Sequence, residues 1–100
     1  MENFRTFQTA VEFYHLAQGL PFKRHLKDQL DRASLSVALN LAEGRSRRTV
    51  KEQQRFFNIA LGSLREVQAL LLIEGLKESR EWKLLDSVAA QLYRLIQQAE

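Results

Sequence analysis

The sequence predicts an all-α protein whose 100 residues form one domain, an antiparallel up-down-up-down four-helix bundle. Three observations lead to this fold class. Apolar residues recur at steps of three and four in four successive segments, which is the period of amphipathic helices. One proline and four glycines are too few turn formers for a multi-stranded sheet. The connections between the segments are short, so neighbouring helices should run antiparallel.

The first two helices have recognisable ends. The first begins near residue 4 and should stop at the sequence QGLPF, because Gly19 suits a C-terminal cap and Pro21 cannot continue a helix. The second is expected from about residue 23 to residue 43. Gly44 should follow it as a capping residue in the left-handed conformation, which costs glycine little.

The third helix has the clearest start signal in the chain. Thr49 followed by Glu52 is typical of a capping box, in which each residue satisfies a backbone donor of the first turn. This helix should run to Glu74 and end at Gly75. The fourth helix is expected over about residues 81–98, where apolar residues again recur at helical spacing.

The second and third helices each carry two apolar stripes instead of one. A second stripe favours burial against another subunit, although a broad core face within one chain is the alternative. The four residues predicted to form an oligomer interface are Leu35, Leu39, Phe56 and Ile59.

Small and polar residues interrupt these two helices. Gly62 and Ser63 lie mid-helix, where glycine costs about 1 kcal/mol relative to alanine, which suggests a close helix approach or a bend. Polar residues of the second helix are Ser34, Ser36 and Asn40. Either the serines bond to their own helix and Asn40 is partly solvated, or Asn40 and Glu43 bond to groups near the following turn.

Composition restricts the class of protein. The chain has no cysteine, which excludes disulfides, thiolate metal sites and a cysteine nucleophile. Its longest purely apolar run is ALLLI, residues 69–73, far below the roughly 20 residues that span a bilayer. The charged N-terminal residues do not resemble a signal peptide. We therefore expect a cytoplasmic protein without a membrane partner.

Patterns of catalytic chemistry are also missing. His15 and His25 stand alone, without a second ligand at metal-binding spacing, and Glu12 with His15 gives only one Glu-x-x-His pair. There is no phosphate-binding glycine-rich loop and no defensible catalytic triad. We expect a protein that is not an enzyme and uses no cofactor or metal.

A basic cluster joins the second and third helices. Residues 45–55, with the sequence RSRRTVKEQQR, contain five basic groups and one acid, although the whole chain has a net charge of only +3. The cluster consists of Arg45, Arg47, Arg48, Lys51 and Arg55. Cations are disfavoured at the start of a helix, so their presence there hints at a use such as phosphate binding. The alternative is a solvated turn whose arginines pair with Glu43 and Glu52.

The central half of the chain carries a recognisable set of residues, which are Gln29, Leu30, Arg32, Ala33, Ser36, Asn40, Ala42, Glu43, Gly44, Arg55, Phe56, Ile59, Ala60, Gly62, Ser63, Leu64 and Glu66. With these residues at this spacing, the chain resembles a bacterial family of four-helix bundles encoded in intervening sequences of 23S ribosomal RNA, the S23 family. Two departures are Ala38, where the family usually has proline, and Asp31, where it often has a basic residue.

The resemblance implies more than the residues show by themselves. It implies a bundle that assembles as a ring, a homopentamer in relatives. The family is also similar in fold to accessory proteins of diversity-generating retroelements, which bind nucleic acid and a reverse transcriptase. RNA or DNA is therefore one expected partner, and a protein such as a reverse transcriptase is the alternative.

Overall fold

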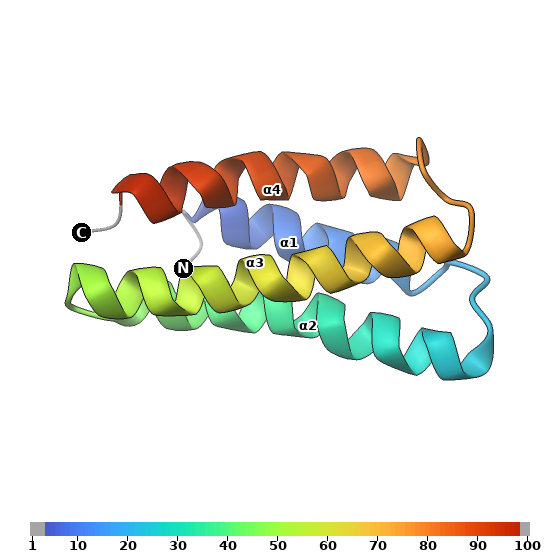
Figure 1. Cartoon of the computed structure of the whole chain (residues 1–100), viewed down its shortest axis with the longest axis horizontal. Coiled ribbons are helices and arrows are strands. Elements are labelled where there is room, and N and C mark those ends of the chain that lie inside the picture. The colour runs from blue at the N-terminus through green and yellow to red at the C-terminus, as the bar shows by residue number, and fades with distance from the viewer. Residues whose placement is uncertain (1–3, 99–100) are drawn as a thin grey trace.

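Four helices run alternately up and down along a common axis in the computed structural model, which describes residues 4–98 (Figure 1). They are α1 (Arg5–Ala17), α2 (Arg24–Ser46), α3 (Val50–Ile73) and α4 (Arg80–Gln98). The described part of the chain contains no strand. The predicted all-α, antiparallel four-helix bundle is confirmed, and each predicted helix is present with its ends shifted by at most a few residues.

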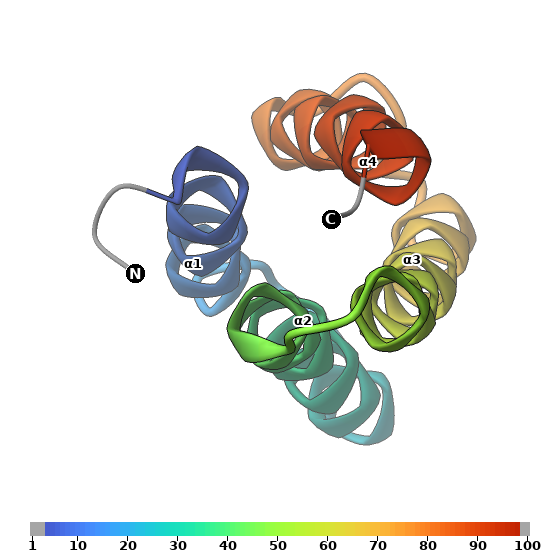
Figure 2. The same ribbon diagram turned by 90° about the vertical axis from the view of Figure 1, so that its left-hand side faces the viewer.

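The helices occupy the corners of a square, so that each packs against the next in the chain and α4 packs back against α1 (Figure 2). The molecule measures 40 × 22 × 22 Å. The core runs along its axis and is made of leucine, valine, alanine and phenylalanine side chains from all four helices. Leu30, Leu41, Leu64, Leu71 and Leu92 are completely buried.

Both ends of α3 follow the sequence signals. The Thr49 hydroxyl accepts a hydrogen bond from the backbone N–H of Glu52 at 3.1 Å and donates one to the Glu52 carboxylate at 3.2 Å. At the other end, Gly75 has a φ of 72°. The N–H of Leu76 bonds to the carbonyl of Leu71 at 2.8 Å and that of Gly75 to Leu72 at 3.0 Å, which is the Schellman pattern. The predicted Thr49 cap and the stop at Gly75 are thus confirmed, whereas the Glu52 half of the capping box is not formed, because this carboxylate accepts the Thr49 hydroxyl instead of a backbone N–H.

The prediction for Gly44 was wrong. α2 continues to Ser46, and Gly44 lies inside the helix without a positive φ. The residue is buried, and a Cβ at this position would lie 2.6 and 2.8 Å from two ring carbons of Phe57. Glycine is needed there because α3 approaches α2 too closely for any side chain, not because the backbone turns.

The end of α1 also differs from its prediction. Gly19 does not have a positive φ, so it does not form a left-handed cap. The Lys27 ammonium group, from the first turn of α2, donates instead to the carbonyl oxygens of Ala17 and Gln18. A cation at the C-terminal end of a helix also interacts favourably with the helix dipole. Lys27 therefore joins α1 to α2, a role that its place in the basic sequence KRHLK does not suggest.

Polar residues join α2 to α3 at mid-height. The hydroxyls of Ser36 and Ser63 are 2.7 Å apart across the two helices, and the Asn40 amide donates back to the Ser36 carbonyl at 2.9 Å. Asn40 thus bonds to its own helix. Ser36 instead bonds to the neighbouring helix, which neither of the two alternatives had predicted. Gly62 is exposed, and no atom lies within 4 Å of a Cβ placed there, so no close approach within the chain explains it.

One helix is apolar enough to be considered as a membrane span. α3 has 24 residues, with a mean hydropathy of 1.4 in its most apolar window, of which 33% is buried. Length and composition alone are weak evidence, because a core helix of a soluble bundle meets the same test. Phe57, Ala60, Leu64, Val67 and Leu71 of α3 pack into the bundle core.

Candidate nucleic-acid interface

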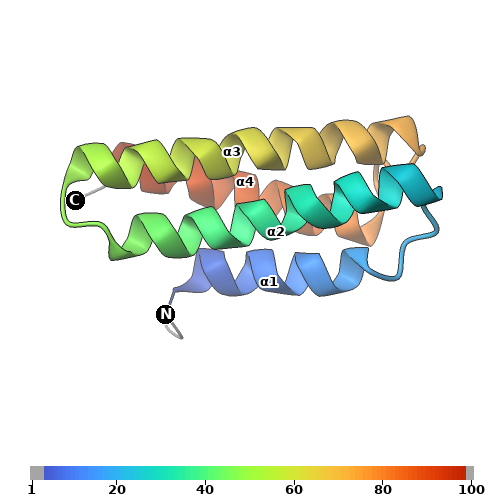
Figure 3. The ribbon, with the colours of Figure 1, turned by 90° about the horizontal axis from the view of Figure 1, so that it is seen from below.

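The five residues of the predicted basic cluster lie together at one end of the bundle. They occupy the last turn of α2, the short connection at residues 47–49 and the first two turns of α3. This connection lies at the same end as the start of α1 and the end of α4 (Figure 3). Because the helices are antiparallel, this end of the molecule brings together three separate parts of the sequence, the start of α1, the α2–α3 connection and the end of α4.

Arg47 differs from the rest of the cluster because it belongs to the turn itself. Its guanidinium group makes an ion pair with Glu43 and lies 4.8 Å from the ring centroid of Phe56. Its backbone carbonyl accepts a hydrogen bond from the Gln53 side chain at 3.0 Å. Arg47 therefore fixes the path of the chain, and the expected pairing of the turn with Glu43 holds for this one arginine.

The other four cations are available to solvent. Arg45, Arg48, Lys51 and Arg55 are exposed, and within residues 4–98 none of them makes an ion pair. Glu52, the expected partner of the turn, receives the Thr49 hydroxyl instead. Four unpaired cations on one short segment create a positive potential that attracts polyanions.

Aromatic rings hold two of these arginines in place. The Arg45 guanidinium lies 4.5 Å from the ring centroid of Phe4, and that of Arg55 lies 5.4 Å from Phe56. Cation–π contacts of this kind restrict the orientation of a long side chain without neutralising its charge. Phe4 is buried, so it links the basic turn to the start of α1.

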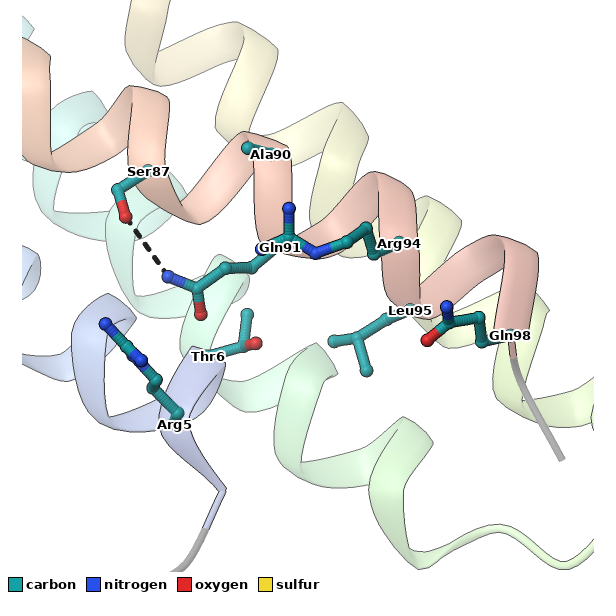
Figure 4. Close-up of a pocket in the computed structure, with 8 residues that line it drawn as sticks. All are labelled: Arg5, Thr6, Ser87, Ala90, Gln91, Arg94, Leu95 and Gln98. Carbon is teal, nitrogen blue, oxygen red and sulfur yellow. Dashed lines mark hydrogen bonds between the residues drawn. The ribbon is translucent and has the colours of Figure 1, made fainter.

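Two more arginines at this end escaped the sequence analysis. Arg5 begins α1 and Arg94 lies in the second half of α4, and both line a cavity of about 380 Å³ between these helices (Figure 4). They are 89 positions apart in the chain. The signal that could have found them is the alternation of helix direction, which places the beginning of the first helix beside the end of the fourth.

The predicted interface residues lie mainly on the outside of α2 and α3. Leu35, Leu39 and Ile59 expose 42%, 56% and 41% of their surfaces. Phe56 is only partly exposed, and its ring is covered by Arg47 and Arg55. Three of the four residues thus remain uncovered in a single chain, as a subunit contact requires.

Nothing among residues 4–98 suggests a catalytic centre built on a metal. That part of the chain contains no group of three or more histidine, aspartate and glutamate side chains placed to hold an ion. His15 and His25 are both exposed.

These features define a class, the small antiparallel four-helix bundle with a cationic end. The model of the 23S rRNA-intervening sequence protein family matches residues 4–98, and the chain belongs to this family. The match extends the likeness of the central helices to all four. No curated protein and no solved structure matches the chain.

Proposed function

We propose that this protein is a non-enzymatic oligomer that binds the RNA or DNA backbone through the α2–α3 turn. The observation that carries the proposal is the set of four exposed cations without ion pairs, Arg45, Arg48, Lys51 and Arg55. A turn selected only for solubility has no need to place unpaired cations at the start of α3, where the helix dipole opposes them. Phosphate groups supply the missing negative charge.

Self-association supports the same function. Leu35, Leu39 and Ile59 are exposed on the outer faces of the two helices that bear the turn. Gly62 lies three positions after Ile59 and leaves open space on its surface, so a second copy can approach α3 closely there. A ring of five copies, the number that the family resemblance implies, would repeat the turn five times and turn weak phosphate contacts into multivalent binding.

Neutralising the turn tests the proposal. The triple variant Arg45→Gln, Arg48→Gln, Lys51→Gln should lower the affinity for a structured RNA hairpin at least tenfold, because each phosphate contact releases counterions on binding. Arg47 is kept because it holds the turn. The measurement is a fluorescence-anisotropy titration at two salt concentrations, in which the slope of log K against log salt should become shallower by about two to three.

A matched variant separates location from net charge. Arg24→Gln, Arg32→Gln, Lys83→Gln removes three exposed cations outside the turn, and it should change the RNA affinity much less. Equal losses in the two triple variants would show that only the overall charge matters. An unchanged affinity in the turn variant would rule out the proposed site.

A second candidate function is a protein-interaction scaffold, for instance an accessory subunit of a reverse transcriptase. The observation that favours it is a separate apolar pair at the C-terminal end of α3, far from the basic turn. Leu72 and Ile73 expose 51% and 68% of their surfaces. A partner protein that stays bound after nuclease treatment, and is lost in Ile73→Lys while RNA binding is retained, would establish this function.

A further inference from the structure

A cavity between α1 and α4 has the features of a ligand site that differs from the basic turn. Its volume of about 380 Å³ falls in the lower part of the range of small-molecule pockets, about 300–1,000 Å³. Its walls come from the first turn of α1 and from α4. Figure 4 shows Arg5 on α1 facing the α4 residues across the cavity.

The charge of this cavity is entirely positive. Arg5 and Arg94 come from different helices, and no carboxylate is among the lining residues. Neither arginine makes an ion pair within the described chain. The first turn of α1, next to the cavity, contains no acidic residue, so the positive end of its dipole is not compensated by a side chain there. Arg5 and Arg94 lie on opposite walls of the cavity, and guanidinium groups are suited to binding an oxyanion.

The remaining lining is mixed, as a site for an organic ligand requires. The Gln91 side-chain nitrogen donates to the Ser87 hydroxyl at 3.1 Å, which orients the amide. The Gln91 carbonyl oxygen is buried and has no donor partner within residues 4–98. Ala90 and Leu95 add apolar surface. A buried acceptor without a donor is costly, and a ligand amino group can satisfy it after a small movement of the side chain.

We infer that this cavity binds a nucleoside carrying a phosphate monoester. Arg5 and Arg94 hold the phosphate, and the nucleobase lies toward Gln91 and the apolar surface. The same chemistry has two sources, a free mononucleotide and the 5′-phosphorylated end of an RNA strand. The site uses none of the five residues assigned to the turn, so it can be present whether or not the turn binds nucleic acid.

The cavity lies on a different side of the bundle from the predicted contact residues. α1 and α4 form the side of the square opposite the α2–α3 pair (Figure 2). The predicted contact residues Leu35, Leu39 and Ile59 belong to α2 and α3, and none of them lines the cavity.

Calorimetric titration at low salt tests the inference, with adenosine 5′-monophosphate, adenosine and inorganic phosphate as separate probes. The monophosphate should bind saturably and at least tenfold more tightly than either other probe. Arg94→Gln and Arg5→Gln should each weaken it about tenfold or more, since each removes a charge-assisted hydrogen bond. Arg24→Gln, which removes an exposed arginine at the start of α2, should leave the affinity within about twofold.

A second arm compares a short RNA with a 5′-phosphate and the same RNA with a 5′-hydroxyl. A preference for the phosphorylated strand that disappears in Arg94→Gln assigns the site to strand ends, and mononucleotide binding alone assigns it to the free ligand. The inference is overturned if adenosine or inorganic phosphate binds as tightly as the monophosphate, or if neither arm shows a dependence on Arg5 and Arg94. The turn variant should keep mononucleotide binding, so failure of one site is distinguishable from failure of the other.

Discussion

Gly44 lies where α2 and α3 come together before the turn. Two ring carbons of Phe57 lie 2.6 and 2.8 Å from the position that a Cβ would occupy, and the Cβ of Phe56 lies at 3.2 Å. Phe57 is buried, so its ring cannot move away into solvent. Gly44 therefore determines how closely the two helices that carry the basic turn can pack.

Gly44→Ala should destabilise the protein despite the better helix propensity of alanine. Overpacking a core contact costs typically 1–3 kcal/mol, while the propensity gain is about 1 kcal/mol, so we expect a net loss of about 1 kcal/mol. Urea unfolding followed by circular dichroism measures it as a lower midpoint at unchanged slope.

Gly62→Ala is the matched control for this substitution. It has the same chemistry in the middle of an exposed helix surface, with no atom within 4 Å of the added carbon. It should raise the stability of the isolated chain by about 0.5–1 kcal/mol. If both substitutions stabilise to the same degree, the close contact at Gly44 is not a constraint on packing.

At the scale of the element, the start of α3 is held by one hydroxyl group. Thr49→Ala removes the acceptor of the Glu52 N–H and should cost about 1 kcal/mol, within the usual range of about 0.5–2 kcal/mol for such caps. Thr49→Ser keeps the hydroxyl and should be close to the wild type. Thermal unfolding of the two variants provides the measurement, and equal midpoints would show that the cap contributes nothing.

The helix ends also show what sequence can and cannot predict. The ends of α3 were predicted because their signals are local, a Thr-x-x-Glu box before the helix and a glycine after its last apolar residues. The end of α1 was not, because Lys27, ten residues further along the chain, caps it across a turn. The role of Gly44 was also predicted wrongly, because the residue that constrains it, Phe57, belongs to another helix. A glycine near the end of a helix can serve the backbone or a neighbouring helix, and only the position of Phe57 distinguishes the two.

At the scale of the whole molecule, the fold was predictable and the full extent of the cationic end was not. Four amphipathic segments and short connections determine an antiparallel bundle. The cluster at residues 45–55 is visible as a run in the sequence, but Arg5 and Arg94 are single residues in different helices. The cavity that they line exists only because α1 and α4 meet, and no spacing within one segment indicates it.

Assembly is the property of the whole molecule on which multivalent binding depends. Leu39 and Ile59 are 56% and 41% exposed in one chain, so charging them leaves the core intact. Leu39→Lys with Ile59→Lys should give a folded single chain of about 11.6 kDa, whereas the wild type should sediment as a larger species at micromolar concentration. Gln97→Lys, which charges an exposed residue of α4, is the control and should still assemble. Because the turn is unaltered, the single chain should keep its own contacts with RNA. It should lose the gain in affinity that repeated sites provide, and its affinity for RNA should therefore fall about 10²-fold or more. A wild-type chain that sediments as a monomer while binding RNA with full affinity would contradict this dependence, and a single turn would then have to supply all of the binding.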